Sequence, residues 1–258
     1  MRVFAKPNLL NDYHLLSYDE LDSTNEEARR LAEGGGAHGA VIWGKRQTAG
    51  RGRMGRMWVS VEGNLFCSIL LAPHCDVETS AQLSFVTSLA VIETLKPIVA
   101  EGNTLTCKWP NDILLNGKKV GGILLESFEA ADMTPGHDRM VRWVVVGVGL
   151  NIDSCPENTD LPSTYLKEAG VEIISAKIVL SRFIHHFITE YDLWAKKGFA
   201  PIRKRWMEHA FRVDQPIEVR LPKETHTGIF EGIDPAGCLL LKPRGGKRIA
   251  ISAGDVFW

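Results

Sequence analysis

The hydrophobic pattern predicts alternating strands and helices over residues 1–210. Short, mainly apolar runs are typical of buried strands. Such runs cover 40–43, 65–71, 113–115, 120–125 and 141–148. Apolar residues at helical spacing predict helices over 79–97, 176–194 and 202–210. A further helix is predicted over 22–33, and glycines 34–36 end it.

One hairpin stands out in this pattern. Asn116-Gly117 lies between two apolar runs and predicts a type I′ turn. Lys118 and Lys119 follow the turn, where composition alone favours solvated lysines at a sheet edge. Gly121-Gly122 in the returning strand indicates that another group approaches the backbone closely.

The pattern changes near Phe211 to short β segments. Strands are predicted over 216–221, 227–233, 238–242 and 248–252, with turns at 234–237 and 244–247. Such a series fits a small β-barrel appended to the main domain. We therefore predict a first domain over 1–210 and a second over 211–258.

Composition excludes several classes of protein. The 258-residue chain has a formal net charge of -1, so no global field recruits DNA or an acidic membrane surface. Its five cysteines are scattered and include no Cys-x-x-Cys pair, which indicates reduced thiols and a cytoplasmic protein. No signal segment or membrane-spanning run is visible. His185 and His186 are adjacent, so they do not form a metal pair on one helix face.

The most informative segment is 50–58, which we call the Gly-Arg loop. Three arginines alternate with three glycines there, and Trp58 closes the loop. Glycine lets backbone amides approach a ligand, and arginine offers planar donors to carboxylate or phosphate. A mobile basic loop and an arginine-glycine nucleic-acid segment are the alternatives. Because the loop joins two predicted strands, we favour a small anionic ligand, with Trp58 over a flat ring.

Two further polar segments flank predicted elements. Ser23 with Glu26, or Thr24 with Glu27, has the spacing of a capping box, although a helix start also offers amides and hydroxyls to a polar ligand. The segment 108–112 follows a strand that brings Lys108 to its end. Turn chemistry explains Pro110, Asn111 and Asp112 in a turn, but it does not explain an adjacent Lys and Trp.

A glycine motif at 147–151 ends the strand predicted over 141–148. It is not a dinucleotide fingerprint, because Ile152 replaces the third glycine and residues 153–156 cannot open a helix. No Walker A loop is present in the sequence either.

Four motifs in one order resemble those of the biotin protein ligases. They are Gly50-Arg51-Gly52-Arg53-Met54-Gly55-Arg56-Met57-Trp58, Lys108-Trp109-Pro110-Asn111-Asp112, Lys119-Val120-Gly121-Gly122-Ile123-Leu124-Leu125-Glu126 and Gly147-Val148-Gly149-Leu150-Asn151. Ser23-Thr24-Asn25 and the terminal β segments also match. The similarity covers nearly the whole chain, and the ordered set is far more specific than any one motif.

The resemblance implies an α+β fold: a mixed β-sheet catalytic domain of the class II synthetase and biotin ligase type, followed by a C-terminal SH3-like β-barrel. It implies an ATP-dependent ligase that forms biotinyl-5′-AMP and transfers biotin to a lysine of a biotin carboxyl carrier protein, such as that of acetyl-CoA carboxylase. Mg²⁺ accompanies the nucleotide. No DNA or membrane partner is expected, and a homodimer remains open. Some relatives carry an N-terminal helix-turn-helix and repress genes, but too few residues precede Ser23 for that domain.

The matched motif positions imply roles for individual residues. Lys119, Arg53 and Lys108 are expected to be catalytic. Biotin is expected to contact Ser23, Thr24, Asn25, Gln47, Arg51, Gly52, Arg53, Lys119 and Gly122. ATP is expected to contact Arg53, Arg56, Trp58, Asn111, Asp112, Gly147 and Asn151. Asp112 is one hypothesis for a magnesium contact, but no metal ligand is assigned.

Two other functions stay open on the sequence. A lipoate or octanoate ligase shares the fold and acyl chemistry, but it would need an apolar tunnel and not the complete Gly-Arg motif. A nucleic-acid-binding module would use the arginines and the barrel, with steeply salt-dependent affinity. For a ligase, the Gly-Arg loop and the loop 153–163 are candidate lids that become ordered with biotin or its adenylate.

Overall fold

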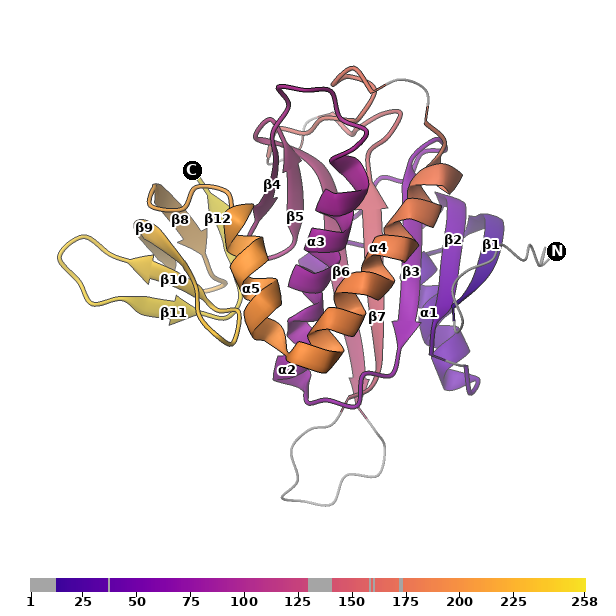
Figure 1. The fold of residues 1–258 in the computed structure, drawn as a ribbon, viewed down its shortest axis with the longest axis horizontal. Helices are drawn as coiled ribbons and strands as arrows, with labels where there is room; N and C mark the ends of the chain where they lie inside the picture. The colour runs from indigo at the N-terminus through magenta and orange to yellow at the C-terminus, as the bar shows by residue number, and fades with distance from the viewer. Residues whose placement is uncertain (1–12, 37, 130–140, 158, 160, 172–173) are drawn as a thin grey trace.

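A seven-stranded mixed sheet forms the centre of the main domain (Figure 1). The computed structural model describes residues 13–36, 38–129, 141–157, 159, 161–171 and 174–258. The strands lie in the order β1-β2-β3-β7-β6-β5-β4. Their bounds are β1 His14–Leu21, β2 Ala40–Gln47, β3 Leu65–Leu71, β4 Leu105–Lys108, β5 Asp112–Leu115, β6 Lys118–Glu129 and β7 Val141–Leu150. Among the strands of the described residues, β1 and β2 pair in parallel and the other neighbours are antiparallel; helix α1 (Thr24–Glu33) supplies the crossover that a parallel pair needs.

Helices cover both faces of this sheet. The helices α3 (Leu83–Leu95), α4 (Ala176–Lys197) and α5 (Phe199–Glu208) pack on one side, preceded by the short α2 (Val77–Ala81). On the other side, α1 packs its alanines against Ile42, Leu70 and Val145. Successive strand residues point to opposite faces, so the neighbouring Val41, Ile69 and Val146 belong to the larger core under α3 and α4.

The C-terminal segment forms a separate five-stranded antiparallel sheet, to the left in Figure 1. Its strands are β8 Pro216–Arg220, β9 Thr225–Ile233, β10 Leu239–Lys242, β11 Ile249–Ile251 and β12 Asp255–Phe257, in the order β11-β10-β9-β8-β12. The connecting segment is tied to the main sheet, because the Cys107 amide donates to His209 O at 2.7 Å and the Phe211 amide donates to Cys107 O at 2.9 Å.

The hydrophobic pattern located most elements, and the structure corrects the following points. Two strands were missed: β1, a charged strand at the sheet edge, and β12, which has three residues. The helix predicted over 79–97 is two helices, α2 and α3. Asp112 is not in a turn: it begins β5 and pairs with Lys108 across the hairpin. Lys119 is not a solvated edge lysine, since its ammonium pairs with Asp112.

Several smaller predictions can also be compared with the structure. Asn116 and Gly117 have φ of 52° and 75°, as a type I′ turn requires. Ser23 precedes α1, but its side chain makes no capping hydrogen bond. All five cysteines are free. Among the described residues, no helix is long and apolar enough to cross a membrane.

Candidate functional site

A cavity of about 410 Å³ lies on the face of the sheet that α1 partly covers. Its floor includes Phe66 from β3, Gly122 and Leu124 from β6, and Gly147 and Gly149 from β7. These positions alternate along their strands, so they share one face. Glycine at three of the five positions leaves room above the sheet where side chains would otherwise stand.

Every residue that the sequence assigned to the site lines this cavity. The set is Ser23, Thr24, Asn25, Gln47, Arg51, Gly52, Arg53, Arg56, Trp58, Lys108, Asn111, Asp112, Lys119, Gly122, Gly147 and Asn151. The main sheet, the start of α1 and the Gly-Arg loop bring these separate segments together. Their individual roles toward a ligand remain predictions.

One end of the cavity is rich in neutral hydrogen-bonding groups. Gln47 Oε1 accepts from the Thr24 backbone amide at 2.8 Å and from the Thr24 hydroxyl at 3.1 Å. Ser68 Oγ lies 2.7 Å from Thr24 Oγ1 and 2.6 Å from Asn25 Oδ1. Such a set of hydroxyls and amides can bind a neutral polar ring through both donors and acceptors.

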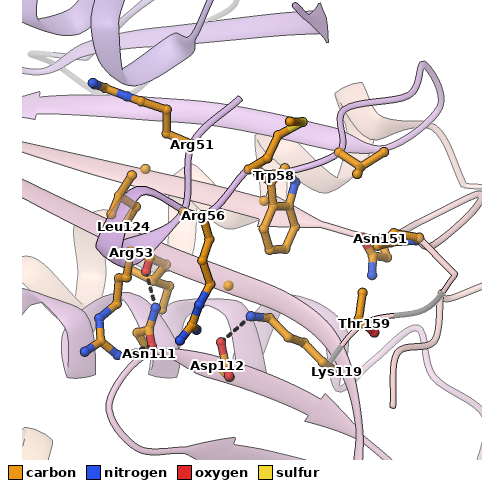
Figure 2. A pocket seen from close by; sticks show the side chains of 18 of the residues that line it. Arg51, Arg53, Arg56, Trp58, Asn111, Asp112, Lys119, Leu124, Asn151 and Thr159 are labelled. Atoms are coloured by element: carbon orange, nitrogen blue, oxygen red, sulfur yellow. Dashed lines mark hydrogen bonds and ion pairs between the residues drawn. The ribbon is translucent and has the colours of Figure 1, made fainter. Parts of the chain in front are cut away.

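The Gly-Arg loop holds its three arginines in different environments (Figure 2). Arg51 extends away from the other two and pairs with Glu26 at 3.0 Å and with Glu126 at 3.2 Å. Arg53 donates to Asn111 Oδ1 at 3.0 Å, and Arg56 pairs with Asp255 of β12. Burial lowers the pKa of the Arg53 guanidinium, although Asp255 opposes this shift.

A buried carboxylate between two lysines lies next to Asn111, the partner of Arg53. Asp112 Oδ1 is 2.6 Å from Lys119 Nζ, and its Oδ2 is 3.1 Å from Lys108 Nζ. Lys108 and Asp112 are each only 5% exposed. Burial lowers the pKa of Lys108, whereas Asp112 raises it. Although burial raises the pKa of Asp112, the two ammonium groups outweigh it and hold that pKa below its usual value.

Trp58 lies flat on the glycine floor. A Cβ built on Gly149 would be 2.5 Å from the indole ring, and one on Gly122 would be 3.1 Å from it. The Lys119 ammonium is 5.4 Å from the ring centroid, within the range of a cation–π contact. The close approach inferred from Gly121-Gly122 is therefore confirmed, because Trp58 reaches Gly122 and the Leu150 side chain reaches Gly121.

Sequence reasoning missed three polar residues at this site. Glu126 and Ser68 bond to Asn25, and Asp255 of the C-terminal sheet pairs with Arg56. Glu126 closes one of the four motifs, but its partners Asn25 and Arg51 are far away in sequence. The signal available for Ser68 and Glu126 was strand alternation, which places both on the cavity face of the sheet.

The residues described here include no group of three or more histidine, cysteine or acidic side chains placed to hold a metal ion. Asp112 also fits poorly as a magnesium ligand in this arrangement, because each of its oxygens already faces a lysine ammonium. We therefore assign no metal ligand on this chain.

Comparison with known proteins assigns the family. Residues 21–141 match the biotin/lipoate A/B protein ligase family, and residues 213–258 match the biotin protein ligase C terminal domain. The biotin--[acetyl-CoA-carboxylase] ligase of Paracoccus denitrificans is 38% identical over 242 residues, which cover 92% of this chain and 97% of that protein. The chain belongs to the biotin protein ligase family. The bifunctional ligase/repressor BirA of Bacillus subtilis is 35% identical over 93% of this chain and 73% of its own length.

Solved structures of this family have the same fold. The biotin protein ligase from Aquifex aeolicus in complex with biotin and ATP superposes with a TM-score of 0.77 at 29% identity, covering 94% of this chain and 97% of that one. The predicted α+β fold, a mixed-sheet catalytic domain followed by a C-terminal all-β domain, is thus confirmed.

Proposed function

We propose that this chain is an ATP-dependent biotin protein ligase. In the first step, a carboxylate oxygen of biotin attacks the α-phosphorus of ATP, and pyrophosphate leaves. In the second, the amine nitrogen of an acceptor lysine attacks the carbonyl carbon of biotinyl-5′-AMP, AMP leaves, and the amine loses a proton. The observation that carries this proposal is the convergence of Arg53, Arg56 and Lys119 on one cavity, in a chain of this family.

The cationic groups reduce the repulsion between the two anionic substrates of the first step. Two anions, a carboxylate and a triphosphate, must meet at a short distance, so catalysis depends on positioning and on charge screening. Lys119 and Arg53 lie on either side of the Asn111-Asp112 segment and are proposed to bind the carboxylate and the α-phosphate between them. Lys108 is proposed to act beside them, since it shares the Asp112 carboxylate with Lys119.

The two ends of the cavity suit the two substrates. The hydroxyls and amides of Ser23, Thr24 and Gln47 offer both donors and acceptors to the ureido ring of biotin. Arg51, Gly52 and Gly122 complete the proposed biotin side. We place ATP near the indole of Trp58, with Arg56, Asn111, Asp112 and Asn151 as further contacts. Gly147, which the motif match assigned to ATP, we propose instead on the biotin side, because a Cβ there would meet Asn25.

The proposal also includes a metal ion and an acceptor protein. Mg²⁺ would enter bound to the ATP phosphates, with waters among its other ligands. The proposed acceptor is a biotin carboxyl carrier domain of acetyl-CoA carboxylase or a similar carboxylase. We propose a cytoplasmic ligase that binds neither DNA nor membrane, and either a monomer or a homodimer is compatible with it.

The decisive experiment is ATP–pyrophosphate exchange with biotin, lipoate and octanoate in parallel. We expect exchange with biotin and little with the two fatty acids. Exchange with lipoate or octanoate alone would replace the proposal by the related acyl ligase. Retention on an oligonucleotide at physiological salt, without exchange for any acid, would favour the nucleic-acid-binding alternative.

A further inference from the structure

The side chain of Asn25 is almost fully engaged by the protein itself. Its Nδ2 donates to Glu126 Oε2 at 2.7 Å and lies 3.5 Å from Leu124 O, and its Oδ1 accepts from the Ser68 hydroxyl at 2.6 Å. Asn25 is only 4% exposed. An amide whose donors and acceptor are already bonded has little hydrogen-bonding capacity left for a ligand.

Glu126 fixes the orientation of that amide. An ionised carboxylate only accepts, so the nitrogen of Asn25 must face Glu126 and its oxygen must face Ser68. Glu126 also accepts from Arg51 at 3.2 Å. One side chain on β6 therefore holds both the start of α1 and the first arginine of the Gly-Arg loop.

The hydrogen bonds continue from Asn25 through the predicted biotin end of the cavity. Ser68 joins Asn25 to Thr24, and the Thr24 backbone amide, which can only donate, fixes the oxygen of Gln47 toward α1. The nitrogen of Gln47 then donates to Ser60 Oγ at 2.8 Å. The Glu126 carboxylate thus sets the directions at Asn25 and Ser68, and the Thr24 backbone amide sets the direction at Gln47.

The β7 backbone at Gly147 leaves room for the Asn25 side chain. A Cβ built on Gly147 would lie 2.1 Å from Asn25 Oδ1. The glycine at position 147 thus makes room for a protein side chain, in contrast to Gly149, which faces Trp58.

We propose that Glu126 is a positioning residue of the biotin site. Through Asn25 and Ser68 it orients the hydrogen bonds that hold the Thr24 side chain beside Gln47, and through Arg51 it anchors the Gly-Arg loop next to them. This inference rests on the proposed function. It assigns Asn25 a role in holding the site and not in contacting biotin.

The proposal is tested by exchanging the amide and the carboxylate between positions 25 and 126. Asn25→Asp places a carboxylate against Glu126, and such a like-charge contact costs several kcal/mol, so we expect a rise of about 100-fold in the KM for biotin. Glu126→Gln keeps an acceptor for Asn25 but loses its charge toward Arg51, and we expect a rise of about fivefold. In the double variant the amide introduced on β6 donates to the carboxylate introduced on α1, and the KM for biotin should return to within about tenfold of wild type.

Several measurements separate positioning from a general loss of structure. The KM for ATP should stay within about twofold of wild type in all three variants, and direct titration of biotin without ATP should follow the KM for biotin. Glu231→Gln is the matched control, because Glu231 also pairs with an arginine and its side chain is 28% exposed, against 30% for Glu126. Ser68→Ala, which removes the partner of Asn25 Oδ1, supplies an independent variant if the charged one does not fold, and should raise the KM for biotin about fivefold.

The outcomes are distinguishable. A double variant as poor as Asn25→Asp, or a loss in kcat with normal biotin affinity, would overturn the role of Glu126. If Asn25→Asp does not fold, unchanged biotin affinity in Ser68→Ala would overturn it as well. A wild-type protein that neither binds biotin nor exchanges pyrophosphate would instead refute the proposed function.

Discussion

At the scale of single residues, the most constrained group in the cavity is the Asp112 carboxylate. It faces two ammonium groups at 2.6 and 3.1 Å in a place almost closed to water. Removing one partner of a buried ion pair costs more than the pair contributes, because the remaining charge stays unneutralised. Asp112 thus holds the side-chain nitrogens of Lys119 and Lys108 close together before any substrate arrives.

This arrangement predicts a pH-dependent stability. Asp112→Asn should lower the free energy of unfolding at pH 7 by roughly 3 kcal/mol, since the buried Lys108 and the partly exposed Lys119 lose their shared counter-ion. The pKa of Asp112 lies below its unfolded value of 3.8, so its stabilising contribution is fully present above that pH and is lost as the pH falls through the folded pKa. Urea unfolding should show a constant difference between variant and wild type from pH 5 to pH 8, which narrows below about pH 4. A difference that stays unchanged at low pH would contradict the prediction.

The sequence motifs identified Asp112 as a site residue but could not identify residues outside the motifs. Sequence reasoning placed Asp112 near the site but in a turn, because Pro110 and Asn111 favour one, and the pairing of Lys108 with Asp112 across the hairpin was not foreseen. Ser68 and Asp255 could not be found this way. Strand alternation could place Ser68 on the cavity face, but its partners Thr24 and Asn25, like the partner Arg56 of Asp255, are far away in sequence.

At the scale of elements, the cavity depends on how β7 alternates. Gly147 and Gly149 lie on the same face of the strand, two positions apart, yet they meet different side chains. Asn25 stands over Gly147, and Trp58 lies on Gly149. The two positions therefore belong to different ends of the cavity.

This difference predicts separate effects for two matched alanine substitutions. Gly149→Ala must displace the Trp58 ring, and we expect the KM for ATP to rise about tenfold with the KM for biotin much less affected. Gly147→Ala pushes on Asn25, and we expect the reverse selectivity. Steady-state pyrophosphate exchange with each substrate varied in turn measures both, and each variant controls for the general cost of a Cβ in this strand. Equal losses for both substrates in both variants would contradict the assignment of the two ends.

The sequence predicted elements well where the signal was local. Apolar runs gave β3 with both ends correct, and the Asn-Gly pair gave the β5–β6 hairpin. In contrast, β1 carries Asp19 and Glu20 and becomes a strand by pairing in parallel with β2. Its hydrogen bonds depend on a partner across the α1 connection, which no short window of sequence contains.

At the scale of the whole molecule, the C-terminal sheet completes the cavity. Trp109 donates to Gly237 O at 3.0 Å, which explains the tryptophan that turn chemistry in segment 108–112 left unexplained. Arg53 donates to Gly254 O at 3.3 Å, and Asp255 pairs with Arg56. Asp255, Val256 and Phe257 of β12 line the cavity. The second sheet is thus connected to the Gly-Arg loop through the same arginines that are proposed to meet phosphate.

Asp255→Asn is therefore expected to loosen the Gly-Arg loop only in the absence of substrate. Without the carboxylate, Arg56 loses a charged partner, and hydrogen exchange of the amides over 51–58 should accelerate about threefold to tenfold, as expected for the loss of one ion-paired hydrogen bond. When biotin and ATP are bound, phosphate oxygens replace the carboxylate as the partner of the arginines, and both proteins should protect the loop equally. Glu218→Gln, on the strand paired with β12, is the control that leaves the loop contacts intact. Faster exchange that persists with substrates bound would mean that Asp255 supports the loop in every state, and unchanged exchange without substrates would mean that β12 does not hold the loop at all.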